Sequence, residues 1–158
     1  MSFTYHVTVY VPDLGGAGTN ENVYFRLIGS QATSGDYLLD LDGYDDLEAP
    51  SHTTYEVVVD EYLGDIKEMY LYVEENSTDG PALYLDCIDV FTQIGGEDKT
   101  WRFNVYSWVG IPDRDPTRTN TINYLWIDHE GIYNKNVKSN EKYDKKSVGR
   151  DYDYSRRL

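Results

Sequence analysis

The chain has a single cysteine, Cys87, and no long run of apolar residues. One cysteine rules out an internal disulfide, and a membrane-spanning helix needs roughly eighteen or more consecutive apolar residues. Basic residues are also scarce, because 14 lysines and arginines stand against 28 aspartates and glutamates, for a net charge of −14. Since phosphate backbones attract basic surfaces, this balance argues against nucleic acid as a partner.

The sequence also lacks a basic segment followed by an apolar stretch ahead of the first strand pattern, which begins at Phe3. That combination would mark a secretory leader. The expected location is therefore the cytoplasm, including its membrane surfaces as a peripheral protein. A secreted chain trimmed of its leader would have the same sequence, so secretion stays open.

Alternation is the most abundant signal, because apolar residues occupy every second position in several short segments. The expected strands lie at residues 3–11, 23–27, 37–41, 55–59, 69–73, 83–90 and 101–105. Glycine, proline, aspartate and asparagine separate them, and no window has a helical period. The alternation slips by one residue near Asp86 and Cys87, which predicts a β-bulge. The sequence therefore predicts an all-β fold, an antiparallel β-sandwich.

The pattern changes after Trp108. Residues 110–121 are polar and proline-rich, as in a linker, and residues 123–133 have the pattern of one small hairpin. Residues 135–158 hold eight basic residues and four acidic ones, so this tail carries +4 while the rest of the chain carries −18. Body and tail should attract each other.

These observations predict two parts. Residues 1–109 form the sandwich, and residues 110–158 form a linker, the hairpin and a basic, tyrosine-rich tail. The tail has little to bury and would be disordered by itself. We expect it to pack on the sandwich or on a neighbouring chain, in which case it could build a homo-oligomer.

Two turns are candidates for a binding site. One is the glycine-rich turn GGAGT at 15–19, and the other is the acidic run LDLDGYDDLE at 39–48. Carbonyl and carboxylate oxygens that meet at one end of a sandwich suit calcium. A solvated turn explains the acidic run as well, because aspartate and glycine are turn residues. On the residues alone, the solvated turn is the simpler interpretation.

Four segments carry a further pattern. They are YHVTVYVPDLGGAGTNENVYFRLIG at 5–29, LGDIKEMYLYVEEN at 63–76, GPALYLDCIDV at 80–90 and WRFNVYSWV at 101–109. In this order they resemble the PLAT domain, the β-sandwich shared by polycystins, lipoxygenases, animal lipases and clostridial alpha-toxin. The resemblance covers residues 4 to 109 and leaves the extension outside.

The resemblance implies a sandwich of two four-stranded sheets and a function in binding, typically docking to membrane lipid or to another protein, often with calcium. The calcium ligands that it implies are Gly18, Thr19, Asn20, Asp42, Asp45, Asp46, Glu75, Asn76 and Asp79. Asn20 departs from the family pattern, which usually has aspartate there. That change removes one formal charge from the site, and calcium affinity follows ligand charge.

Apolar residues in the same turns bear on membrane contact. Leu14 and Tyr44 lie in or beside the implied calcium turns. Exposed apolar side chains next to a cation suit shallow insertion into a lipid interface. An acidic body is repelled by anionic lipid until its charge is offset, so calcium would act as the switch.

No nucleophile elbow, phosphate loop or dinucleotide fingerprint occurs in the sequence, so we expect no enzyme. The leading hypothesis is a non-enzymatic, calcium-binding PLAT module that docks to membrane lipid. The alternative is a protein-interaction module that uses the outward tyrosines Tyr70, Tyr72 and Tyr84 together with the basic tail. Against that alternative, the extension could cover the outward tyrosines instead, because its own Tyr124, Trp126, Tyr133 and Tyr143 need somewhere to pack. A carbohydrate-binding role is a weaker third option.

Overall fold

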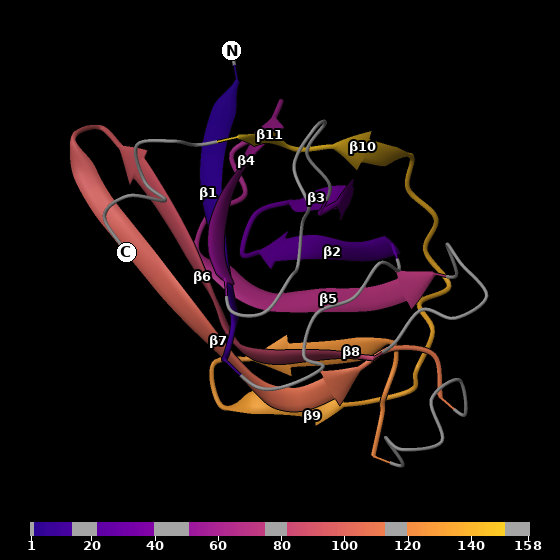
Figure 1. The fold of residues 1–158 in the computed structure, drawn as a ribbon. Helices are drawn as coiled ribbons and strands as arrows, with labels where there is room; N and C mark the ends of the chain where they lie inside the picture. Colours follow the sequence, from indigo (N-terminus) through magenta and orange to yellow (C-terminus); the bar gives the residue numbers. More distant parts are fainter. Residues whose placement is uncertain (1, 14–21, 40–50, 75–81, 113–119, 151–158) are drawn as a thin grey trace.

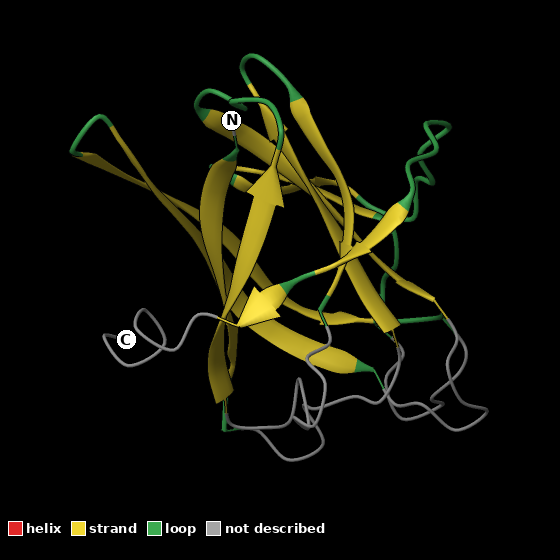
Figure 2. Cartoon of the chain, turned by 90° about the horizontal axis from the view of Figure 1, so that it is seen from above, coloured by secondary structure: helices red, strands yellow, loops and turns green. Residues whose placement is uncertain are grey.

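A computed structural model describes residues 2–13, 22–39, 51–74, 82–112 and 120–150. These residues form strands joined by turns, with no helix among them and hence none that could cross a membrane (Figure 2). The strands are β1 (Phe3–Val11), β2 (Asn22–Gly29), β3 (Thr33–Leu38), β4 (Ser51–Val59), β5 (Ile66–Glu74), β6 (Leu83–Ile94), β7 (Glu97–Val109), β8 (Leu125–Asp128), β9 (Gly131–Asn134), β10 (Lys145–Ser147) and β11 (Gly149–Arg150).

The strands form two sheets that pack face to face (Figure 1). One sheet has five strands in the order β11-β4-β1-β6-β7, and the other has six in the order β10-β3-β2-β5-β8-β9. All neighbours are antiparallel except β10 and β3, which run parallel. The all-β sandwich expected from the sequence is confirmed.

The core forms because alternate side chains of each strand point between the sheets. On β1, Tyr5, Val7 and Val9 are buried from the five-stranded side, and Phe25 and Leu27 of β2 meet them from the other side. Each fully buried aliphatic or aromatic side chain contributes about 1.5–3 kcal/mol relative to its exposed state. Burial of this alternating set fixes the strand register, because a slip of one residue would turn every apolar side chain to solvent.

The expected bulge is present. The pairing of β6 with β7 shifts register between Leu85 and Cys87, and Tyr106 on the facing strand has a φ of 46°. The short strand expected at 37–41 lies instead at Thr33–Leu38. Gly35, with a φ of 89°, and a register shift between Arg26 and Ile28 obscure the alternation there.

Each sheet is larger than the four strands that the resemblance implied, because the C-terminal region adds strands to both. The expected small hairpin is β8 and β9, and β8 pairs with β5 through Leu71 and Leu125. Leu125 and Ile127 are fully buried in the common core. The six-stranded sheet therefore continues well beyond residue 109.

The glycine that ends the second strand allows a close crossing of two chain segments. A Cβ at Gly29 would lie 2.0 Å from the carbonyl oxygen of Leu63, so no larger residue fits without movement. The amide of Gln31 donates to that same oxygen at 2.9 Å. Gly64 follows with a φ of 81°, a conformation that glycine adopts without strain. This crossing brings the glycine that ends β2 against Leu63 and Gly64, at the start of the segment LGDIKEMYLYVEEN.

Candidate functional site

The strand ends that flank the implied calcium turns gather at one end of the sandwich, which we call the loop pole. Val11 at the end of β1 is opposite Ser51 at the start of β4, and Asn22 at the start of β2 is opposite Glu74 at the end of β5. The amide of Leu39, just after β3, donates to the carbonyl of Val23 at 2.9 Å. The register thus places the borders of all three turns at the same pole.

The implied ligands themselves are not among the described residues. This holds for Gly18, Thr19, Asn20, Asp42, Asp45, Asp46, Glu75, Asn76 and Asp79, and also for Leu14 and Tyr44. Within the part of the chain that the structure describes, no group of three or more histidine, cysteine, aspartate or glutamate residues could hold a metal ion. The calcium ligands and the membrane contacts stay predictions.

A second candidate site lies on the outer face of the six-stranded sheet. Tyr24, Tyr70 and Tyr72 point away from the core and form a separate buried cluster, which we call the tyrosine face. Tyr124 and Trp126 pack against it, with ring centroids 6.0 Å from Tyr72 and 4.4 Å from Tyr70, respectively. Although these tyrosines lie on the outer face of the sheet, another segment of the chain covers them and buries them.

The cover is the chain's own tail. Residues 135–150, which we call the strap, cross the tyrosine face and continue to the other sheet. In Figure 1 the strap ends in the golden strands β10 and β11 at the top of the view. β10 pairs with β3, β11 pairs with β4, and Val148 between them joins the core.

Burial of Tyr70 and Tyr72 corrects the alternative hypothesis in one respect. These two tyrosines are 2% and 8% exposed, so they offer no free surface to a partner in this structure. Tyr84, the third outward tyrosine, is partly buried and packs edge-on against Trp108, with centroids 5.2 Å apart. The possibility that the extension covers the outward tyrosines is realised for Tyr70 and Tyr72.

A buried ion pair lies at the centre of the tyrosine face. Arg26 donates to both carboxylate oxygens of Asp36, at 2.6 and 3.2 Å, and the two side chains are 3% and 5% exposed. Tyr72 donates to the same carboxylate at 2.5 Å, and Arg26 also donates to Ser139 Oγ of the strap at 3.0 Å. The guanidinium lies between the rings of Tyr70 and Tyr143, at 4.9 and 4.5 Å.

The electrostatics of this pair follow from burial. Burial alone would lower the pKa of Arg26, but the hydrogen bonds and charge of Asp36 raise it above its ordinary value. The pKa of Tyr72 is raised, first by burial and then by its hydrogen bond to Asp36. Arg26 therefore stays charged and Tyr72 stays protonated at neutral pH, so neither is poised to exchange a proton.

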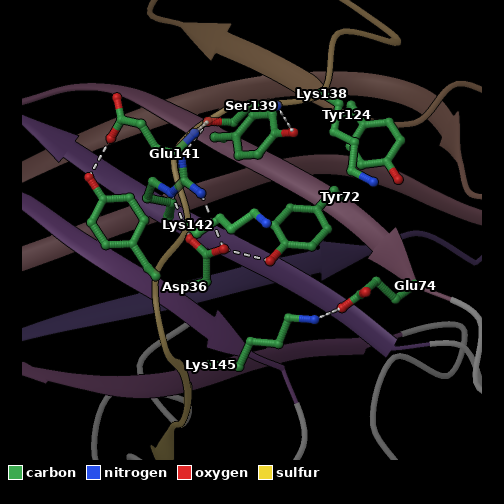
Figure 3. Close-up of a pocket in the computed structure, with 12 residues that line it drawn as sticks. Asp36, Tyr72, Glu74, Tyr124, Lys138, Ser139, Glu141, Lys142 and Lys145 are labelled. Carbon is green, nitrogen blue, oxygen red and sulfur yellow. Dashed lines mark hydrogen bonds and ion pairs between the residues drawn. The ribbon is translucent and has the colours of Figure 1, made fainter.

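Between the strap and the sheet lies a cleft of about 290 Å³ (Figure 3). Tyr72 and Tyr124 line its sheet side, and Lys138, Lys142 and Lys145 line its strap side. Lys145 pairs with Glu74, the last residue of β5, and lies over the ring of Tyr24. The cleft is thus walled by aromatic rings and ammonium groups.

The sequence that forms these strands matches a known family. The family model described as PLAT/LH2 domain matches residues 5–123.

The chain belongs to the PLAT/LH2 family.

Relatives and solved structures agree with this. The polycystin family receptor for egg jelly of Mus musculus is 28% identical over 107 residues, which are 68% of this chain and 5% of the receptor. A calcium-dependent 11R-lipoxygenase is 25% identical with a TM-score of 0.55, over 67% of this chain and 16% of that one. The coral 8R-lipoxygenase, described by calcium activation via a C2-like domain, is 19% identical with a TM-score of 0.60, over 98% of this chain and 19% of that one.

The PLAT domain is a non-catalytic module, and the lipoxygenases match only over a small share of their length. The family match ends at residue 123, before β8 and the strap. The tyrosine cleft is therefore built partly by family strands and partly by residues beyond the match.

Sequence reasoning singled out Tyr70 and Tyr72 but not Arg26 or Asp36. The signal was available only for Arg26, a charge within a strand whose other residues are mostly apolar or aromatic; Asp36 lies in TSGDYL, which is mostly small or polar, and precedes the strand expected at 37–41. A charge in such a strand needs a partner. Only the pairing of β2 with β3 shows that each is the partner of the other.

Proposed function

We propose that this PLAT domain docks to membrane lipid in a calcium-dependent manner through the loop pole. The observation that supports this most is the register that brings Val11, Asn22 and Glu74 to one pole, because these residues border two of the three implied calcium turns. Leu39 and Ser51 border the third turn at the same pole. Calcium binds six to eight oxygen ligands, which turns that meet at one pole can supply together.

The donor chemistry is suited to calcium. Carboxylates from Asp42, Asp45 and Asp46 are hard oxygen ligands, and the Gly18–Asn20 turn adds carbonyl and amide oxygens. The two lipoxygenases named above are described as calcium-dependent or calcium-activated, which is consistent with this assignment. Calcium bound there would neutralise part of the charge of an acidic chain, which carries −14 overall.

Membrane docking follows from that neutralisation. An acidic surface is repelled by the anionic cytoplasmic leaflet, and a bound divalent cation reverses the local sign. Leu14 and Tyr44 would then contribute shallow apolar contacts with the interface.

The test has two stages. A calcium titration followed by thermal unfolding should raise the midpoint, because a ligand that binds only the folded state stabilises it by mass action. The double variant Asp42→Asn with Asp46→Asn should abolish the rise. The matched control is Asp60→Asn with Glu97→Gln, which makes the same charge change among exposed residues at the opposite pole and should keep the rise.

The second stage is sedimentation with vesicles that contain phosphatidylserine, with calcium or with a chelator. Calcium-dependent sedimentation that is lost in the Asp42/Asp46 variant and kept in the control supports the proposal. A midpoint that calcium does not move would sink the calcium site. A midpoint shift without sedimentation would remove the membrane half.

A further inference from the structure

We infer that the cleft between the strap and the tyrosine face is a binding site for a phosphomonoester group, and that it works without calcium. This site goes beyond the proposed function, because it lies on the outer face of a sheet and uses strap residues outside the family match. The argument rests on the charges and the aromatic rings that line the cleft.

The acidic side chains of the cleft already have partners. Asp36 accepts from Arg26 and Tyr72, and Glu74 is paired with Lys145. Glu141 accepts a hydrogen bond of 2.5 Å from the hydroxyl of Tyr143, which lies beside it on the strap. All three carboxylates therefore accept a hydrogen bond from a neighbouring side chain. Two of them, Asp36 and Glu74, are also neutralised by a basic side chain.

Two of the four basic side chains of the cleft, Lys138 and Lys142, have no carboxylate partner among the described residues. The ammonium of Lys138 lies 5.6 Å from the centre of the Tyr124 ring, and neither Lys138 nor Lys142 forms an ion pair with any described residue. The chain has twice as many acidic as basic residues, so carboxylates that could pair with these lysines are abundant. The ammonium of Lys138 instead lies over the Tyr124 ring, and the Lys142 side chain extends toward Tyr72 (Figure 3).

The shape of the cleft indicates the ligand class. Lys138, Lys142 and Lys145 approach the cleft from different directions, and the Tyr72 and Tyr124 rings, stacked at 17°, form its back wall (Figure 3). A phosphomonoester carries nearly two negative charges at neutral pH and offers three acceptor oxygens. Its charge matches the ammonium groups of Lys138 and Lys142, and the group it is attached to can lie on the tyrosine rings. The cleft volume of about 290 Å³ is near the lower end of the range for small-ligand pockets.

The first experiment uses the full chain with phenyl phosphate in a chelator, so that the calcium site has no part in it. Binding is followed by tryptophan fluorescence, to which Trp126, packed on Tyr70, contributes, and by amide chemical shifts of the strap. We expect saturable binding, with shifts concentrated at residues 138–145. Benzenesulfonate, which carries a single charge, should bind more weakly.

The variants separate the cleft from diffuse charge. Lys138→Gln with Lys142→Gln should weaken phenyl phosphate binding about tenfold, because two charge-assisted contacts are lost. The matched control is Lys67→Gln with Lys135→Gln, which removes the same charge from exposed positions that do not line the cleft. The control should bind within about twofold of the parent, since distant exposed charges are screened.

The source of the phosphate is decided by a vesicle arm, again in chelator. Vesicles with phosphatidic acid carry a phosphomonoester, whereas vesicles with phosphatidylglycerol carry only a diester. Retention by the former alone, lost in the Lys138/Lys142 variant, assigns the site to a lipid headgroup. Binding of phenyl phosphate without vesicle retention assigns it to a soluble ester. Absence of saturable binding in both arms, or equal weakening in both double variants, would overturn the inference.

Discussion

The outer faces of the two sheets carry nearly the same three side chains in different surroundings. On the six-stranded sheet, Arg26 of β2 is directly opposite Asp36 of β3, and Tyr72 donates to the carboxylate. On the five-stranded sheet, Arg102 of β7 is directly opposite Asp89 of β6, with hydrogen bonds of 2.7 and 2.8 Å. Tyr10 donates to that carboxylate at 3.4 Å.

The two pairs differ in whether another segment of the chain covers them. The strap buries the first pair, whose side chains are 3% and 5% exposed, while Arg102 and Asp89 are 57% and 14% exposed. A buried pair is costly to break, because one charge is left without water or a partner, whereas an exposed pair is screened by solvent. Loss of one partner should therefore cost more free energy of folding in the Arg26–Asp36 pair than in the Arg102–Asp89 pair.

Removal of the strap should have the largest effect. A chain that ends at Asn134 loses Val148 from the core and the pairings of β10 and β11. We expect the free energy of unfolding to fall by about 5 kcal/mol. Denaturant unfolding measures the loss. The tryptophan emission should also shift to the red, because Trp126 on the tyrosine face becomes exposed to water. An unchanged midpoint and spectrum would show that the strap does not cover this face in solution.

Asp36→Ala should have the next largest effect, because it leaves the guanidinium of Arg26 buried without a carboxylate. Breaking a buried pair in this way costs about 3–5 kcal/mol. Urea unfolding at pH 7 measures the loss. In the shortened chain that ends at Asn134 the same substitution should cost much less, since Arg26 can then be hydrated. Equal costs in both chains would contradict the role given to the cover.

Tyr72→Phe should change the alkaline stability. The pKa of Tyr72 is raised in the folded chain, first by burial and then by Asp36, so folding favours the protonated phenol. Its contribution is present below the unfolded pKa near 10 and is lost as pH rises above that value. Unfolding at a series of pH values from 9 upward should give a shallower decline for the variant. Tyr10→Phe, at the equivalent place on the other face, should change the slope less; a larger change for Tyr10 would contradict the comparison.

Asp89→Ala should have the smallest effect, a loss of about 1 kcal/mol or less, because Arg102 remains hydrated when its partner is removed. The same urea experiment measures it, and added salt should shrink the difference from the parent. A loss as large as that of Asp36→Ala would show that exposure is not what separates the two pairs.

Several features of the fold were predictable from local pattern. The alternation of Tyr5, Val7 and Val9 predicted an inward face, and the phase slip at Cys87 predicted the bulge. The hairpin of β8 and β9 was also predictable, because its turn residues separate two short apolar segments. The strand β3 was displaced in the prediction, since Gly35 breaks the alternation and its position depends on pairing with β2.

The candidate sites were predictable to different degrees. The four PLAT-like segments predicted the family, and the strand register is consistent with a common pole for the implied calcium turns. The cleft was not predictable. Lys138 and Lys142 are ordinary members of a basic tail in the sequence, and nothing local shows that they line one cleft with Tyr72 and Tyr124.

By itself the sequence determined the class of fold, the family and the opposite charges of body and tail, because these depend on spacing and composition along the chain. Only the tertiary structure decided which outward residues are covered. The strap meets β3 and β4 from more than eighty residues away, and contacts over such distances arise from packing of the whole chain. The pairs Arg26–Asp36 and Arg102–Asp89 consist of the same two residue types, and only the tertiary structure shows that one is buried and the other is not.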